Sequence, residues 1–300
     1  MRRGLKAVII AAVALITVGL ALTIFSAIFY GSSVFNYITT ARTGGQSERI
    51  TVTMSASELQ SLRLKITNAQ ITVTQSKDGN ASITYNYYAD ENFMQTNTAG
   101  TLAVEQQGNV FFGLFDWFQN RDHQVEIALP AECTARVSIS LVNGSINGEN
   151  FAAGDLVISQ TNGSISLSDV KSADSIAVDT VNVGIAVADC TAADEIRCKS
   201  VNGKIENGAL TAKQVYCETV NGRISVDKAE ADSITCTTVN GSMEVGIRGS
   251  EDDYSMSFSS VNGSLTVDNE NLGKSANIRG GSKSAKFSSV NGSATVHFLP

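Results

Sequence analysis

Four charged residues lie close together in a repeated region of the sequence and could do chemistry. Lys204 and Glu206 follow one Asn-Gly pair, Arg223 follows the next, and Glu244 follows the third. Two carboxylates on one outward face are what hydrolysis of a glycosidic bond requires, which makes a glycan-active enzyme one alternative. A solvated strand face with cross-strand ion pairs has the same composition and is the favoured interpretation. We predict a ligand-binding strip at these four residues, without catalysis.

Other catalytic and metal-binding patterns are missing. The two histidines, His123 and His297, lie one in each terminal region and cannot form a triad, and no Gly-rich phosphate loop or zinc motif is present. Several aspartates could attract Ca²⁺, but the Gly-Gly-x-Gly-x-Asp pattern of calcium-binding β-rolls does not occur. We interpret them as turn-forming residues; they are Asp169, Asp174, Asp189, Asp194 and Asp232. No cofactor, metal or catalytic residue is predicted.

The five cysteines offer a further reactive group. Cys198, Cys217 and Cys236 occupy one inward position of successive repeats, where other repeats carry Val, Ile or Phe. They are predicted to be small apolar filler in a stacked core. A disulfide between adjacent repeats is the alternative. A structural zinc is not expected, because one linear column cannot supply four tetrahedral ligands.

A Val-Asn-Gly triplet or close variant recurs eight times and must position all of these residues. The spacings between the asparagines run from 19 to 29 residues, mostly 19 or 20. A period near 20 is typical of a stacked β-solenoid. We predict that the asparagines form an internal ladder in which each amide bonds the coil above and below; they are Asn143, Asn162, Asn182, Asn202, Asn221, Asn240, Asn262 and Asn291.

Each repeat contains two short segments in which apolar residues alternate with polar ones, and the Asn-Gly pair lies between them. This alternation predicts two half-buried strands per coil. The corner glycine is expected to adopt a left-handed conformation, and Val183 at this position in one coil should alter the corner locally. An antiparallel hairpin is the alternative that Asn-Gly allows. Glycosylation at Asn-Gly-Ser is a weaker alternative, since a ladder asparagine would be inaccessible.

The N-terminal sequence predicts a membrane anchor that leaves the rest of the chain outside the cytoplasm. Residues 7–30 are almost uncharged and largely apolar, which predicts an uncleaved transmembrane signal-anchor helix. Residues 1–6 form a basic tip on the cytoplasmic side, and residues 31–48 read as a polar stalk. The whole chain has 300 residues and a net charge of -7. This acidic balance without basic stripes argues against a nucleic-acid partner.

Before the regular repeats of residues 137–300, residues 49–136 are predicted to form an N-terminal β region that caps the solenoid. Asn68 already stands at a ladder position, so the surrounding strand looks like a degenerate first coil. An aromatic segment interrupts this region. It is predicted to be a hydrophobic cap, with an exposed patch for a protein partner or membrane as the alternative; its members are Phe111, Phe112, Leu114, Phe115, Trp117 and Phe118.

The sequence resembles the bacterial putative-adhesin family, domain of unknown function 4097, over roughly residues 49–300. The resemblance rests on the segment at 68–73, the strand at 125–130 and the serial Val-Asn-Gly coils. The resemblance implies a β-solenoid, often membrane-tethered in Gram-positive bacteria, and carries no catalytic residues. We expect a non-catalytic adhesin-like binding or scaffold module at the cell envelope, with cell-wall polymer or another envelope protein as partner and with self-association through the solenoid ends. The alternative is an envelope-stress sensor that docks a membrane protein.

Overall fold

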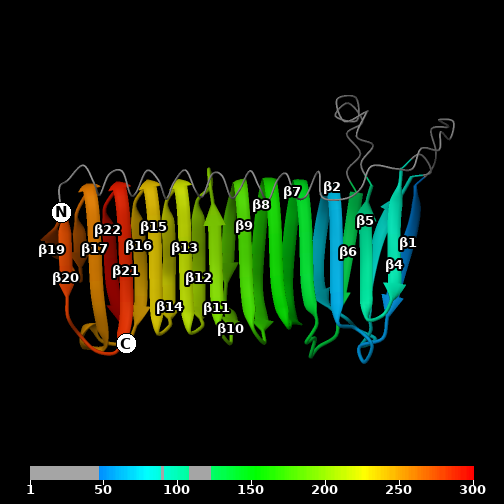
Figure 1. Cartoon of the computed structure of the whole chain (residues 1–300), viewed down its shortest axis with the longest axis horizontal. Helices are drawn as coiled ribbons and strands as arrows, with labels where there is room; N and C mark the ends of the chain where they lie inside the picture. The colour runs from blue at the N-terminus through cyan, green and yellow to red at the C-terminus, as the bar shows by residue number, and fades with distance from the viewer. Residues whose placement is uncertain (1–46, 89–90, 108–122) are drawn as a thin grey trace.

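A computed structural model describes residues 47–88, 91–107 and 123–300. Within them, 22 strands lie side by side along one long axis (Figure 1). None of these residues belongs to a helix long and apolar enough to cross a membrane. The predicted anchor at 7–30, the stalk at 31–48 apart from its last two residues, and the aromatic segment at 111–118 lie outside the described residues.

The regular coils stack in parallel and in register. Val137 lies beside Leu156, and Leu156 lies beside Ile176, so each inward residue contacts its counterpart one coil away. This pairing confirms the parallel solenoid and rules out tight hairpins at the Asn-Gly pairs. The strands of these coils are β7 (Arg136–Ala153), β8 (Asp155–Ser172), β9 (Ser175–Ala188), β10 (Cys190–Ala192), β11 (Glu195–Ser200), β12 (Ile205–Thr211), β13 (Gln214–Asn221), β14 (Ile224–Glu230), β15 (Ser233–Asn240) and β16 (Met243–Arg248).

Several coils contain a third strand segment that sequence reasoning placed in a turn. Residues 170–172 and 190–192 pair with each other in parallel as part of β8 and as β10, and both show the buried–exposed–buried pattern of a half-buried strand. The turn comes earlier, where Asn150, Asp169 and Asp189 have φ values of 49°, 51° and 54°. Asn and Asp tolerate this left-handed conformation. The turn-forming interpretation of Asp169 and Asp189 is therefore confirmed, but the prediction of only two strands per coil is wrong here.

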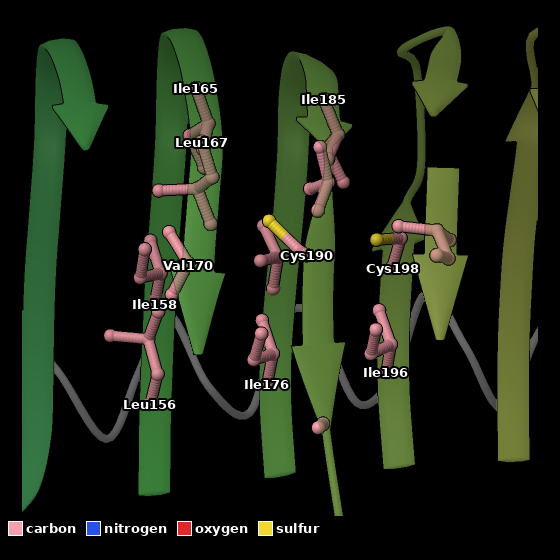
Figure 2. Close-up of a cluster of buried hydrophobic side chains, with 14 of the residues drawn as sticks. Leu156, Ile158, Ile165, Leu167, Val170, Ile176, Ile185, Cys190, Ile196 and Cys198 are labelled. Atoms are coloured by element: carbon pink, nitrogen blue, oxygen red, sulfur yellow. The ribbon is translucent and has the colours of Figure 1, made fainter. Parts of the chain in front are cut away.

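The core is a set of apolar columns between the strand layers. Figure 2 shows Leu156, Ile176 and Ile196 at the same height in successive coils, and none of the three is exposed to solvent. Cys217 lies in register between Cys198 and Cys236, as predicted, and all five cysteines are buried free thiols. Polar Asn207 interrupts the next column, and its amide nitrogen lies 3.5 Å from the sulfur of Cys217.

The predicted asparagine ladder is present, but it is not internal. Eight side-chain amide bonds of 2.8 to 3.0 Å link nine asparagines in one row that begins at Asn68. Most of these side chains are exposed at the corner, and Asn68 and Asn162 are half-buried. The expectation of an inaccessible ladder is wrong because the Asn side chain points away from the core at the bend, whereas the residue two positions earlier points inward.

The corner glycines are required by close packing between coils. A Cβ on Gly203 would overlap the Val183 carbonyl group, with 2.6 Å to its carbon, and the later corners are equally tight. Among the corner glycines only Gly144 and Gly163 have a positive φ, 137° and 129°. The predicted left-handed corner is therefore wrong for the later coils. Val183 does alter its corner: it buries its side chain completely, and the atom nearest to a Cβ added at Gly184 would be the Lys204 Cγ at 3.7 Å.

A buried polar column under the corner was missed in the sequence. The residue two positions before each ladder asparagine points inward and, in several coils, donates a hydrogen bond to the corner carbonyl of the preceding coil in the stack. Ser200 reaches the Val183 carbonyl at 3.0 Å, and Thr219 reaches that of Gly203 at 2.9 Å. Both side chains are 1% exposed. This column pairs backbone oxygens that the bend removes from the regular ladder.

The N-terminal end mixes parallel and antiparallel strands. β2 (Ser61–Gln75) forms the first coil against β7, with Asn68 beside Asn143, which confirms the predicted degenerate coil. Its other edge pairs with β5 (Thr101–Gln106) and β6 (His123–Leu129). β4 (Phe93–Thr98) then pairs with β5, β3 (Ala81–Tyr87) pairs with β6, and β1 (Glu48–Met54) pairs with β3, all antiparallel.

The C-terminal end has a crossed connection. After β17 (Tyr254–Asn262) and β18 (Leu265–Val267), the predicted loop is instead two strands, β19 (Glu270–Gly273) and β20 (Ser275–Ile278), which pair antiparallel with β18 and β17. The last coil, β21 (Lys283–Asn291) and β22 (Ala294–Leu299), inserts between the coil of β15 and β16 and the coil of β17 and β18. The ladder follows this spatial order, since Asn291 bonds both Asn240 and Asn262.

Candidate functional site

The predicted ligand-binding strip forms two exposed ion pairs. Lys204 immediately precedes β12 and Glu206 is its second residue, and their charged atoms lie 2.7 Å apart. Arg223, just before β14, pairs with Glu244 on β16. The structure therefore brings the four residues onto one face but satisfies each charge with another member of the group. Neither glutamate is held as a free carboxylate for acid–base chemistry.

The two histidines do not form a shared site. His123 on β6 is buried, and its ring nitrogens lie 2.9 Å from the Asn86 carbonyl oxygen and 3.1 Å from the Glu91 carboxylate. His297 on β22 lies 3.8 Å from the Asp268 carboxylate in a half-exposed position. These contacts anchor the two ends of the solenoid. In the parts of the chain that the structure describes, no three His, Cys, Asp or Glu side chains are grouped so that they could hold a metal ion.

A shallow groove of about 450 Å³ lies on the strands that precede the Asn-Gly corner, whereas the predicted strip lies on the strands that follow it. Sequence reasoning did not find this groove. Outward side chains of β7, β8, β9, β11 and β13 line it. Its floor is formed by Val157 and Ala177, which lie in register with Arg197 and Tyr216 on the next two coils. The hollow arises because two small side chains stand beside two large ones in the same outward column.

One side of the groove carries a fixed ion pair. The Arg136 guanidinium lies 3.0 Å from one carboxylate oxygen of Asp155, and the Ser175 hydroxyl donates to the other at 2.6 Å. Because these residues start successive in-register strands, the backbone ladder places their side chains next to each other. Arg136 is 61% exposed, so most of its N–H donors face solvent.

The opposite side carries a second pair that is largely shielded. Arg197 donates to the Asp179 carboxylate at 2.8 Å, with the two side chains 27% and 14% exposed. Burial raises the pKa of Asp179, and the positive charge of Arg197 opposes this effect. The pair therefore holds the Arg197 side chain against the sheet beside the groove floor.

Tyr216 forms the end wall and is fixed from two directions. Its hydroxyl donates to the Glu218 carboxylate at 2.6 Å, and the Lys199 ammonium lies 4.8 Å from the ring centre and 3.3 Å from the same carboxylate. Burial raises the pKa of Tyr216, and the hydrogen bond to Glu218 adds to this shift. The phenol is thus neutral at physiological pH, and the aromatic wall is rigid.

A signal for this groove exists in the sequence. The position five residues before each ladder asparagine is Ser or Thr in several coils but Val157, Ala177, Arg197 and Tyr216 in four consecutive ones. The change lies before the corner, whereas the charged residues that suggest chemistry lie after it. Whether a column of outward residues forms a hollow also depends on the lateral register, which the spacing alone does not fix.

The fold and the groove define a class of protein: an all-β stack of parallel coils with a polar outward surface. The chain belongs to the Toastrack DUF4097 family, whose family model matches residues 59–294. This membership confirms the resemblance seen in the sequence. No curated protein matches the chain.

Several solved structures are similar to this chain. A putative adhesin from Parabacteroides merdae ATCC 43184 is 13% identical with a TM-score of 0.50, covering 86% of this chain and 98% of its own. A putative cell adhesion protein from Clostridium sporogenes ATCC 15579 is 9% identical with a TM-score of 0.31, over 85% and 100%. A putative lipid binding protein from Parabacteroides distasonis ATCC 8503 is 13% identical with a TM-score of 0.37, over 86% and 98%. At 13% identity, the first of these likenesses shows the fold alone.

Proposed function

We propose that this protein is a non-catalytic binding module of the bacterial cell envelope that recognises its ligand on the strand face carrying the groove. The groove from Arg136 to Tyr216, with Val157 and Ala177 as its floor, is the observation that carries the proposal. Its charged and aromatic side chains are held by the protein's own hydrogen bonds on a sheet whose register is fixed from β2 to β22. Preorganised side chains of this kind lower the entropic cost of binding.

A binding role fits the chemistry better than an enzymatic one. Glu206 and Glu244, the carboxylates that would serve a glycosidase, are each engaged by a cation. The carboxylates near the groove floor, Asp155 and Asp179, are also paired with arginines. A general acid needs a carboxyl group that can give its proton to the substrate, and these four are committed to structural contacts. Within the described residues, this leaves Glu195 as a single carboxylate without an ion pair in the groove, where glycoside hydrolysis requires two.

The proposed location rests on the amino-acid sequence. The apolar run at 7–30 is long enough to span a bilayer, and the basic tip before it favours a cytoplasmic N-terminus. The solenoid would then stand outside the membrane, tethered through the polar stalk. In this arrangement the strand faces remain accessible to wall polymers or to other envelope proteins.

The test is retention of the full-length protein, in detergent, on purified cell-wall polymer and on detergent-solubilised membranes. Ala177→Leu fills the groove without changing a charge, whereas Arg223→Ala breaks one ion pair of the predicted strip. We expect retention on wall polymer that Ala177→Leu abolishes and Arg223→Ala preserves, with no sugar released. Loss through Arg223→Ala alone would move the binding face to the strip. No retention on either material, or turnover of the wall, would overturn the proposed function.

A further inference from the structure

We propose that the groove takes a neutral glycan chain, which lies across the coils along the solenoid axis with one sugar ring seated on Val157 and Ala177. This inference rests on the proposed function and adds the chemical class of the ligand. It follows from the charge balance of the groove, from its floor, and from the surface beside it.

The charge balance disfavours an ionic ligand. Arg136, Arg197 and Lys199 are the cations of the groove, and each lies within 3.3 Å of a carboxylate of the protein. An anionic polymer would have to compete with those carboxylates. When the ion-pair partners Asp179 and Glu218 are counted with the lining, four acids stand against three bases. Removing one partner from a shielded ion pair is costly. A ligand without formal charge avoids this cost.

Hydroxyl groups match the hydrogen-bonding capacity that remains. A guanidinium has five N–H donors, and Arg136 uses one of its terminal nitrogens in the pair with Asp155. Glu195 also lines the groove, and its carboxylate forms no ion pair with any residue that the structure describes. The donors of Arg136 and the carboxylate acceptor of Glu195 therefore both line the groove. A sugar hydroxyl both donates and accepts, so neighbouring hydroxyls of one ring can use both kinds of group.

The floor suits the body of a sugar ring. Val157 is half-buried and Ala177 is 8% exposed, so together they offer a small apolar surface below the polar rim. A volume of about 450 Å³ falls within the range of small-molecule sites. The C–H face of a pyranose can rest on such a surface while its hydroxyls point outward to the rim.

The surface beyond the groove favours a chain over a single sugar. Arg197 and Tyr216 close the groove toward β15, but toward β7 the floor continues as hydroxyl side chains before Arg63 and Lys65 on β2. These hydroxyl neighbours are Ser138, Ser140 and Ser159. The coils repeat about every 4.8 Å, so a second sugar ring on this side would lie over these hydroxyls.

The experiment is calorimetric titration of the full-length protein in detergent with defined tetrasaccharides. The neutral probes are tetraacetylchitotetraose, cellotetraose and maltotetraose, and the anionic probe is tetragalacturonate. Three variants are compared: Ala177→Leu fills the floor, Glu195→Gln removes one charge without changing shape, and Ser257→Leu is the matched control. Ser257 occupies the same outward column as Ala177 at the far end of the solenoid. Circular dichroism verifies that each variant is folded.

We expect at least one neutral probe to bind, with affinity reduced about tenfold by Ala177→Leu and about fivefold by Glu195→Gln, because a carboxylate accepts a stronger hydrogen bond than an amide. Ser257→Leu should leave the affinity unchanged. The Glu195→Gln variant also distinguishes a neutral ligand from an anionic one. It would increase the affinity for an anion, because it removes the repulsion between the ligand and the carboxylate.

Binding of tetragalacturonate alone, or a gain of affinity in Glu195→Gln, would overturn the neutral-glycan proposal. So would failure of all three neutral probes up to about 1 mM. If wall polymer is still retained in that case, only the ligand class is wrong. If it is not retained, the proposed function fails as well.

Discussion

Three glycines of the same solenoid provide a graded test of how tightly the coils stack. A Cβ added at Gly203 would overlap the Val183 carbonyl group, and at Gly208 it would meet the Ala188 Cβ at 3.0 Å. At Gly184 the nearest atom would be the Lys204 Cγ at 3.7 Å, which is ordinary contact. None of the three has a positive φ. Alanine at each position therefore tests space between coils and not backbone conformation.

The expected loss follows from what the overlap breaks. Relieving it at Gly203 must separate two coils at a point where the Asn202 amide bonds Asn182 at 3.0 Å and the buried Ser200 hydroxyl bonds the Val183 carbonyl at 3.0 Å. An exposed bond contributes about 1 kcal/mol, and a buried hydroxyl left unpaired costs about 1–3 kcal/mol. With the backbone bonds beside them, we expect Gly203→Ala to lower the free energy of unfolding by about 4 kcal/mol.

The other two variants set the scale. Gly208→Ala meets the end of a small side chain and should cost about 1 kcal/mol. Gly184→Ala meets nothing and should stabilise by about 0.5 kcal/mol, because alanine has less conformational freedom in the unfolded chain. Gly184→Ala is therefore predicted to be the most stable of the three variants, Gly208→Ala the next and Gly203→Ala the least stable.

Urea unfolding followed by circular dichroism measures the order. Repeat arrays can depart from two-state behaviour, so the transition midpoint and its slope should be compared for every variant. Failure of Gly203→Ala to fold while Gly208→Ala gives a shifted midpoint agrees with the reasoning. A Gly203→Ala midpoint equal to that of Gly184→Ala would refute it, since the coils would then have room for a methyl group at the corner.

Three further outcomes can be checked with the same materials. Asn221→Ala removes two ladder bonds and should destabilise by about 1 kcal/mol in urea, whereas Asn262→Ala at the end of the row removes one and should cost about half as much. Val183→Gly restores the repeat consensus yet should destabilise by about 2 kcal/mol, because it removes a completely buried side chain. Burial raises the pKa of Cys190 from 9.0 to about 11. Because the thiol of the unfolded chain ionises at a lower pH, the free energy of unfolding should fall as the pH rises from 9 towards 11. For the same reason of burial, the native thiols should react with Ellman's reagent at about pH 8 only after unfolding.

Stacking made the fold predictable. Residues such as Leu156, Ile176 and Ile196 keep their type because each lies against its counterpart one coil away, so the column is visible in one dimension. The same logic identified Asn68 as a ladder member 75 residues before Asn143. It also placed the thiols of Cys198 and Cys217 side by side in the core.

Features that depend on direction or on chain crossing could not be read from spacing. The ladder asparagines bend outward because Ser200 and its counterparts occupy the inward position, and periodicity does not say which of two polar columns is buried. The strand at Cys190–Ala192 is three residues long, too short for a periodic signal. The groove depends on side-chain size in a lateral column from Val157 to Tyr216, which becomes apparent only when the coils are laid side by side.

The insertion of the last coil has a consequence for how the molecule is made. During synthesis from the N-terminus, coils up to β16 can add one upon another as they leave the ribosome, but β17 and β18 have no permanent neighbour to add to. The strands at Lys283–Asn291 and Ala294–Leu299 are synthesised later still, yet they form the layer between. The coil of β17 and β18 can therefore join the stack only after the coil that follows it has been made. Gene duplication can accordingly lengthen the array where successive coils are neighbours, as from β7 to β16, but not at the point where the chain crosses.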